Sequence, residues 1–397
     1  MITPSFGLTA TERVLPKLAL DFTTASLDSR VTFTRTTNAT NPATYTNSSG
    51  NVTVATNNQP RFDYDPVALT CKGLLIEESR ANLVLQSEDI GTTWIQNASP
   101  TITLNATTSP AGTLTADLVE ASIISSGVFQ TVTVSNATAY TLSYYIKAAP
   151  GSTDPIVRIG FGGNVVQYNT STFATIPGGI FTTTTVQDVG NGWRRVTMTG
   201  TTATTSYNVL IYGASSGSKF YVWGAQLEVG AFATSYIPTT TTALTRNADV
   251  ATMTGTNFSS WWSATIGSVS AWVISKAITG INAIIQFDDT TLANQICLRG
   301  NVANPELYIK ATTDQAQIDA GTIVVNTAYK LTGAWNTNNC AASQNGATAV
   351  TDGSATIPSV TQARIGSDGT TYANAWIQKI MYWPQRITND EVQAFSK

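Results

Sequence analysis

Apolar and polar residues alternate along many short runs of the chain, and the clearest of these runs extends from Tyr140 to Ala148. One face of this run carries Leu142, Tyr144 and Ile146, and the other carries Ser143, Tyr145 and Lys147. Successive side chains of a β-strand point to opposite faces of a sheet. We therefore predict a strand whose first face lies in a core and whose second, polar and aromatic face lines a groove.

Runs of similar composition follow one another up to Val229, separated by Gly, Asn, Ser and Pro. They cover residues 101–107, 128–134, 156–162, 192–200, 207–213 and 219–229. Many short strands at close spacing, with such residues between them, are typical of a β-sandwich or barrel. The Thr-rich stretch from Thr234 to Asp249 has little core-forming pattern, and we interpret it as an extended strap and linker.

The same rhythm returns toward the C-terminus. Strand-like runs cover residues 268–276, 282–289, 295–300, 306–313, 329–336 and 377–383. Asn345-Gly346 is the strongest turn signal in the chain and favours a two-residue type I′ hairpin. Thr388, with Glu391 three residues later, predicts the capped start of a short helix. The predicted fold class is therefore all-β, with two consecutive β-sandwiches.

Residues 1–72 contain short strand-like runs between turn clusters, with too few apolar residues for a core of their own. We expect an N-terminal arm that lies along the following domain or another subunit, or that anchors the protein to a larger particle. The predicted domains are the arm at 1–72, a first sandwich at 73–249 and a second at 250–397.

The composition supports strands. Charged residues make up only 11% of the 397 residues, while Thr occupies 67 positions. Thr is β-branched and suits a half-buried strand. Hydrophobic residues at 42% and a net charge of only −3 argue against disorder. Cys71, Cys297 and Cys340 are too few and too scattered for a disulfide framework, so we expect buried free thiols, although Cys297 and Cys340 could be neighbours.

The charge pattern and the missing residue types exclude several functions. A pI near 5.1 gives no basic footprint for nucleic acid. No apolar run is long enough to span a membrane. The N-terminus lacks the basic start and apolar core of a signal peptide, so we expect synthesis in a cytoplasm without export. The chain has no His, which excludes Ser-His-Asp and Cys-His catalysis and His-ligated zinc.

The stretch GLLIEESRANLVLQSED, from Gly73 to Asp89, resembles a signature of tail and fibre proteins of tailed bacteriophages. Three other segments resemble the same proteins. They are LDFTTASLDSRVTFTR (residues 20–35), PRFDYDP (residues 60–66) and FYVWGAQLEVGAFATSYIPTTTTALTRNADV (residues 220–250). The resemblance implies a jelly-roll module of carbohydrate-binding type and a homotrimer. In the second predicted sandwich, at 250–397, the order of YKLTGAWN, the Asn-Gly hairpin, ARIGSD and the closing strand resembles concanavalin A-like, laminin-G-type domains.

Carbohydrate binding is the leading hypothesis for the chemistry. Sugars offer flat C–H faces that stack on aromatic rings and hydroxyls that need hydrogen-bond partners. The chain has 9 Trp and 14 Tyr beside few charges. Our glycan-binding candidates are Tyr145, Lys147, Arg195, Tyr212, Gln226 and Trp261. Trp261 and Trp262 would point opposite ways in a strand, so that one is exposed; the alternative is burial at a boundary between domains or subunits.

We expect no cofactor and no catalysis. Calcium is the one ion considered, with possible ligands Asp288, Asp289, Asp314 and Asp319, but calcium needs several carboxylates among its oxygen ligands and no dense Asp/Asn loop is present. A glycosidase needs two carboxylates flanking the scissile bond, and no motif marks such a pair.

Together these features predict a non-catalytic structural protein of a tailed-phage virion, made in the host cytoplasm. The most specific expectation is a tail-fibre or receptor-binding component that contacts host cell-surface polysaccharide and joins other virion proteins through its N-terminal arm. A homotrimer would multiply weak sugar sites. Two alternatives stay open: a capsid decoration or head-fibre protein, and a polysaccharide-degrading tailspike.

Overall fold

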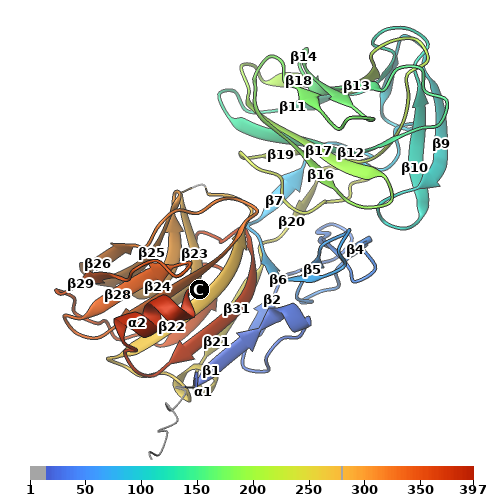
Figure 1. Ribbon diagram of the computed structural model, residues 1–397. Coiled ribbons are helices and arrows are strands. Elements are labelled where there is room, and N and C mark those ends of the chain that lie inside the picture. The colour runs from blue at the N-terminus through green and yellow to red at the C-terminus, as the bar shows by residue number, and fades with distance from the viewer. Residues whose placement is uncertain (1–14, 279) are drawn as a thin grey trace, which may run out of the picture.

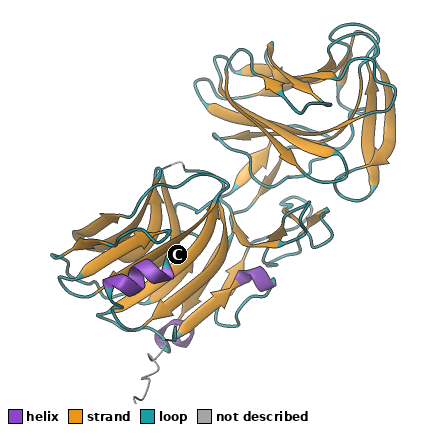
Figure 2. Ribbon diagram, in the orientation of Figure 1, coloured by secondary structure: helices purple, strands orange, loops and turns teal. Residues whose placement is uncertain are grey.

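The computed structural model describes residues 15–278 and 280–397, and its regular structure is almost entirely β-strand (Figures 1 and 2). The strands form two separate sandwiches, which confirms the predicted all-β class. The helical pieces in the described residues are short: η1 (Phe22–Thr24), α1 (Thr256–Ser259) and α2 (Asn389–Phe395).

One sandwich, which we call the inserted sandwich, contains residues 95–229. Its first sheet has the order β16 (Phe181–Asp188), β17 (Trp193–Thr201), β12 (Ala139–Ala148), β19 (Lys219–Val229), β10 (Leu114–Glu120) and β9 (Thr101–Thr108). Its second sheet has the order β15 (Thr175–Ile176), β14 (Asn164–Asn169), β13 (Ile156–Phe161), β18 (Ser206–Gly213), β11 (Gly127–Thr133) and β8 (Ile95–Asn97). The predicted inward face of β12 is confirmed, because Leu142, Tyr144 and Ile146 are fully buried in this core.

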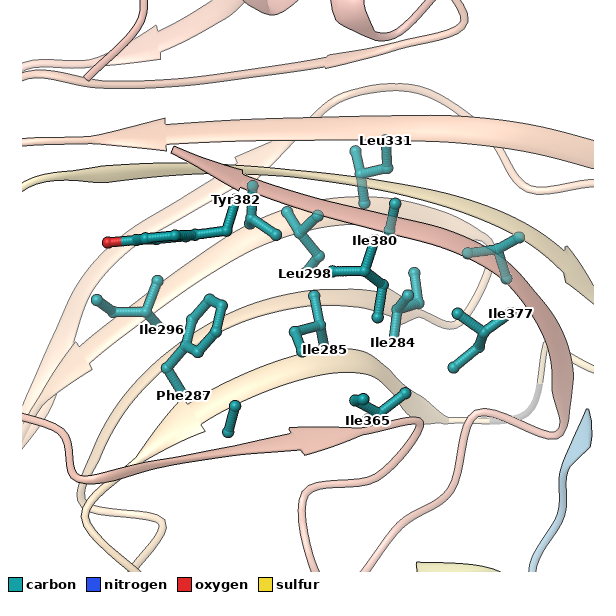
Figure 3. Close-up of a cluster of buried hydrophobic side chains, with 14 of the residues drawn as sticks. Ile284, Ile285, Phe287, Ile296, Leu298, Leu331, Ile365, Ile377, Ile380 and Tyr382 are labelled. Atoms are coloured by element: carbon teal, nitrogen blue, oxygen red, sulfur yellow. The ribbon is translucent and has the colours of Figure 1, made fainter. Parts of the chain in front are cut away.

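The other sandwich, which we call the terminal sandwich, draws strands from both ends of the chain. One sheet has the order β29 (Val350–Asp352), β28 (Cys340–Gln344), β27 (Ala328–Trp335), β22 (Gly267–Ser275), β31 (Ala375–Trp383), β6 (Cys71–Ile76) and β5 (Phe62–Tyr64), and β1 (Leu18–Asp21) also pairs with β31. The facing sheet has the order β2 (Thr32–Thr34), β21 (Val250–Thr254), β30 (Gln362–Ile365), β23 (Ile281–Asp288), β24 (Asn294–Asn301), β25 (Asn304–Ala311) and β26 (Thr313–Asp319). Figure 3 shows Ile285, Leu298 and Ile380 packed between these sheets.

Of the segment expected to form an arm, residues 1–14 lie outside the described residues, and strands β1, β2, β5 and β6 of the remainder belong to the terminal sandwich. Strands β1 and β6 pair with successive parts of β31, and β2 pairs with β21. The physical reason is apolar burial, because these strands place Leu18, Leu20, Leu74 and Ile76 in the core of the terminal sandwich. The segment therefore lies mainly in the terminal sandwich, but it also contacts the domain that follows it, because the amide of Val52 donates to the carbonyl of Pro110 at 2.9 Å. The inserted sandwich interrupts the terminal one.

The chain crosses between the two sandwiches twice. The outgoing strand β7 (Arg80–Asn82) pairs antiparallel with the returning strand β20 (Leu244–Arg246), so the crossings form a two-stranded ribbon between the sandwiches (Figure 1). A second small ribbon pairs β3 (Thr44–Thr46) with β4 (Val52–Val54).

Two local predictions in the terminal sandwich are confirmed. Asn345 and Gly346 both have positive φ, and the amide of Ala347 donates to the carbonyl of Gln344, as a type I′ turn requires. At α2, Thr388 accepts from the amide of Glu391, and the Glu391 carboxylate accepts from the amide of Thr388, which is the predicted capping box.

The three cysteines are free thiols. Cys297 and Cys340 are buried, as expected, and Cys71 is partly exposed. Over the described ranges, none of the helices has the length and apolar character needed to cross a membrane.

Candidate functional site

Six charged side chains meet where the chain passes between the two sandwiches, and we call them the junction network. They are Arg35, Arg61, Glu77, Arg246, Asp249 and Lys276. Arg35 Nη1 lies 2.6 Å from Asp249 Oδ1, and Arg61 Nη1 lies 2.9 Å from Glu77 Oε2. Arg61 also pairs with Asp249, and Lys276 pairs with Glu77. All of these side chains except Lys276 are fully buried.

The network joins segments that are far apart in the sequence. Five of its members come from residues 20–35, 60–66, 73–89 and 220–250: Arg35, Arg61, Glu77, Arg246 and Asp249. A buried charge is stable only when it is paired and hydrogen-bonded. These five charged positions therefore have a shared structural role, which is to hold one another at the junction.

The cationic surroundings keep Glu77 ionised. Burial alone would raise the pKa of Glu77, but the charges of Lys276, Arg246 and Arg61 hold it well below its usual value. Glu77 also accepts hydrogen bonds from the amide (2.9 Å) and hydroxyl (2.7 Å) of Ser235, which lies in the segment that leaves the inserted sandwich. The carboxylate thus fastens this segment to the terminal sandwich.

Asn82 secures the other side of the junction. Its side-chain nitrogen donates to the carbonyls of Ala225 (3.0 Å) and Ile237 (2.9 Å), and its oxygen accepts from the amides of Val84 and Leu227 (both 3.1 Å). All the hydrogen-bonding capacity of this buried amide is used. The ribbon is therefore held to β19 and to the Thr-rich strap.

A cleft of about 910 Å³ lies beside the junction. Its walls come from three parts of the chain: the segment from Thr44 to Leu75, the outer face of β16 and β17 with the strap that follows β19, and the terminal sandwich at Ile274–Ile278 and Trp376. Its volume is in the range of ligand sites, which is about 300–1,000 Å³. The size and the convergence of these segments make it the candidate site.

On the terminal-sandwich side, Trp376 is the centre of the wall. Its Nε1 donates to Asp63 Oδ2 at 2.7 Å. The ammonium of Lys72 lies 3.8 Å from the Trp376 ring centroid and that of Lys276 lies 5.2 Å from it. Lys72 also lies 3.5 Å from Asp63 Oδ2. Cations over an aromatic face are attracted by its quadrupole, so these contacts help to fix the Trp376 ring and the two lysines in place.

On the inserted-sandwich side, Tyr145 and Arg195 lie opposite each other on β12 and β17. The Arg195 guanidinium carbon lies 5.4 Å from the Tyr145 ring centroid, and Tyr145 makes an edge contact with Trp223 at 5.2 Å. Tyr236 from the strap packs on both rings. Thr183, Thr185 and Gln187 are exposed along the neighbouring β16 and extend this wall with hydroxyl and amide groups.

Two of the six predicted glycan-binding residues, Tyr145 and Arg195, lie together in the cleft wall, although only 4% of Tyr145 is exposed and its ring packs on Trp223 and Tyr236. Lys147 lies on the same strand, but its ammonium is directed to the ring of Trp193, 5.9 Å from the centroid. Tyr212 is half-buried on β18, in the opposite sheet. Neither of these two residues lines the cleft.

Gln226 and Trp261 have almost no exposed surface. Gln226 is fully buried, with its amide bonded to Glu228 Oε1 at 2.7 Å and to the amide of Ile237 at 2.7 Å. Trp261 is 2% exposed and packs on Phe258 and Tyr382 in the core of the terminal sandwich. The expectation that one residue of the Trp261–Trp262 pair is exposed assumed a strand. These residues instead follow helix α1, and both rings turn inward.

Sequence reasoning missed Lys72, Lys276 and Trp376. They stand at separate places in the sequence, on β6, after β22 and on β31, and their meeting depends on long-range strand pairing. The sequence does contain one signal nearby. Within Gly73–Asp89 the apolar run at residues 74–76 is followed directly by the charged run at residues 77–80, and this boundary lies at the junction.

The acidic residues considered for calcium are occupied by protein partners. Asp288 accepts from Arg364 Nε at 2.9 Å and from Gln362 Nε2 at 2.5 Å, and Asp314 accepts from the hydroxyl of Tyr308 at 2.5 Å. Asp289 accepts from Thr291 and Asn294, and Asp319 from the amide of Gly321. Across residues 15–278 and 280–397 no group of three or more Cys, Asp or Glu side chains is arranged to hold a metal ion.

No protein-family model matches the chain, and no curated protein matches it. Among solved structures, the chain is similar to a carbohydrate-binding module, the CBM40 of the Ruminococcus gnavus IT-sialidase bound to α2,3-sialyllactose. The two sequences are 11% identical, the match covers 34% of this chain and 84% of that chain, and the TM-score is 0.30. It is also similar to domain 4 of AbnA, an arabinanase of Geobacillus stearothermophilus, in complex with arabinotriose, with 15% identity, 38% and 73% covered, and a TM-score of 0.31. At these TM-scores the similarities carry no argument about this chain, and its sandwich fold is established by its own strand topology.

Proposed function

We propose that the protein is a non-catalytic, glycan-binding structural component of a tailed-phage virion, and that the cleft beside the junction network holds the glycan. The observation that carries the proposal is the composition of the cleft. Aromatic rings at Tyr45, Phe232 and Trp376 share its walls with the exposed hydroxyls and amide of β16. Rings suit the C–H faces of sugars, and the polar groups suit their hydroxyls.

The state of the carboxylates in the cleft supports binding without catalysis. Asp63 accepts from the Thr46 amide at 2.6 Å and from the Trp376 indole at 2.7 Å. Asp65 accepts from the amides of Val67 (2.9 Å) and Ala68 (2.8 Å), and these bonds outweigh burial and lower its pKa. A glycosidase needs one carboxyl group that stays protonated to act as acid, and a carboxyl with a lowered pKa suits that role poorly.

The virion assignment, and within it the tail-fibre or receptor-binding role, is supported by the resemblance of residues 20–35, 60–66, 73–89 and 220–250 to phage tail proteins. The same resemblance is the basis for proposing a homotrimer, host cell-surface polysaccharide as ligand and other virion proteins as partners. A trimer places three clefts on one particle, which raises the avidity for a repeating polysaccharide. Light scattering of the purified protein would measure its stoichiometry.

A blocking substitution tests the cleft. Thr185 is exposed on β16 and lines the cleft, so Thr185→Trp would fill it without disturbing a core. We expect binding to a panel of bacterial surface polysaccharides, measured on a glycan array, to fall at least tenfold. The matched control is Thr131→Trp, at an exposed position on β11 in the opposite sheet, which we expect to bind normally.

Equal binding by both variants would place the glycan elsewhere, and no binding by the native protein to any member of the panel would contradict the proposal. Oligosaccharides released from the polysaccharides during incubation would contradict its non-catalytic part and favour the tailspike alternative.

A further inference from the structure

Arg195 is a buried cation in the cleft wall. It is 8% exposed. Its Nη1 donates to the Thr234 carbonyl at 2.8 Å, and its Nη2 and Nε both approach the Ser143 hydroxyl, at 3.0 and 3.3 Å. Among the residues that the structure describes, it forms no ion pair. Because a guanidinium has five N–H donors and three are used, two remain for a ligand in the cleft.

The rest of the junction uses its cations differently. Arg35, Arg61 and Arg246 face Glu77 and Asp249, and Lys276 pairs with Glu77. A buried charge normally needs an ionic partner or a full set of hydrogen bonds. Arg195 therefore differs from these four cations. It lines an open cleft, whereas each of them faces a carboxylate.

The charge around the cleft is positive in a chain whose net charge is −3. Its lining includes three cations, Lys72, Arg195 and Lys276, and two carboxylates, Asp63 and Asp65. The junction network behind it adds Arg35, Arg61 and Arg246 against Glu77 and Asp249. The lining itself therefore carries one more cation than carboxylates, and Arg195 is the lining cation that forms no ion pair among the described residues, which favours an anionic ligand beside it.

We propose that the cleft selects acidic glycans and that Arg195 binds the carboxylate of a sugar acid, such as a uronic acid. This inference rests on the proposed glycan-binding function and names its ligand class. The planar guanidinium matches the two oxygens of a carboxylate, and such charge-assisted bonds are roughly twice as strong as neutral ones. The Tyr145 ring lies beside the guanidinium, with its centroid 5.4 Å from the Arg195 guanidinium carbon.

The test uses the full-length protein and oligosaccharides that contain glucuronic acid, each compared with its carboxyl-reduced form, which carries the corresponding neutral sugar. We expect the native protein to bind the acidic member of each pair at least tenfold more tightly, as measured by calorimetry, with the preference weakening as salt is raised.

Variants at two adjacent positions test whether Arg195 causes the preference for acidic glycans. Arg195→Gln should remove most of the preference for the acidic member, because it lowers the affinity for the acidic member much more than the affinity for the neutral one. The matched control is Arg194→Gln. Arg194 precedes Arg195 on β17, pairs with Asp188 at 2.8 Å and does not line the cleft. Its variant should therefore keep the full preference for the acidic member.

Because Arg195 is buried, a melting curve must show that its Gln variant is folded. If it is not, Arg195→Lys retains the charge but lacks the planar fork, and it should lose several-fold of the preference. A folded Arg195 variant with the native preference would overturn the role of this residue. Equal binding of acidic and neutral members by the native protein, still abolished by Thr185→Trp, would overturn acidic selection while the proposed glycan binding stands. The absence of all glycan binding would overturn both.

Discussion

Glu77 and Asp249 are the two anions on which four cationic side chains depend. Removing one partner of a buried ion pair leaves an uncompensated charge, which costs more than the pair contributed. We expect Glu77→Gln to lower the free energy of unfolding by about 3–5 kcal/mol. Chemical denaturation of the purified variant would measure the change.

Glu78, the next residue, is the matched control for this substitution. Its carboxylate pairs with Arg80, and its side chain is 32% exposed. Exposed ion pairs contribute about 0–1 kcal/mol, so Glu78→Gln should lower the free energy of unfolding by less than about 1 kcal/mol. Similar losses for the two variants would show that the junction network does not carry the stability we assign to it.

The same carboxylate predicts a pH dependence. Because the folded-state pKa of Glu77 lies well below its usual value of 4.5, the unfolded state binds more protons at this group between those two values. The stability that Glu77 contributes is fully present above pH 4.5 and is lost as the pH falls toward the folded-state pKa. The difference in unfolding free energy between the native protein and Glu77→Gln should therefore shrink as the pH is lowered through 4.5 toward the folded-state pKa. A difference that stays constant over this range would contradict the assignment.

At the scale of elements, the sequence predicts what neighbouring residues determine. The alternation along Tyr140–Ala148, the Asn345-Gly346 turn and the Thr388 cap each depend on residues close in sequence, and each is found in the structure. Trp261 was misjudged for the same reason, because its alternation was analysed as a strand. Gly255 and helix α1 break that period and turn both tryptophans inward.

The cap of α2 gives a test at this scale. Thr388→Ala removes the hydroxyl that accepts from the amide of Glu391 and donates to its carboxylate. Loss of an N-cap costs about 1 kcal/mol, so the free energy of unfolding should fall by that amount. Thr388→Ser keeps the hydroxyl and should stay within a few tenths of the native value. Equal losses for Ala and Ser would show that the cap is not what stabilises this end.

At the scale of the whole molecule, local patterns do not show which strands pair. As sequence, both Leu18–Asp21 and Cys71–Ile76 are short apolar runs. Their positions are set by pairing with the same edge of β31, which lies hundreds of residues later in the chain. The cleft has the same origin. Tyr145 and Arg195 were found because they share one sheet face, whereas Lys72, Lys276 and Trp376 reach the cleft only after both ends of the chain have joined.

This topology makes a last prediction about fragments. Residues 250–397 alone lack β1, β2, β5 and β6, and with them Leu18, Leu20, Leu74 and Ile76 of the core. Each fully buried aliphatic side chain contributes about 1.5–3 kcal/mol, so the four together match the whole stability of a typical domain. We expect this fragment to be unfolded by circular dichroism and proton NMR.

The matched comparison keeps the N-terminal strands and removes only the inserted sandwich. Asn82 of β7 lies opposite Leu244 of β20, so residues 83–243 can be replaced by an Asn-Gly turn that closes the ribbon as a hairpin. This variant retains the terminal sandwich and every cation and anion of the junction network, although Glu77 loses its bonds to Ser235. We expect it to unfold cooperatively, at a lower temperature than the full chain. A stable fold for 250–397 alone, or none for the hairpin-closed variant, would contradict the assembly of this sandwich from both ends of the chain.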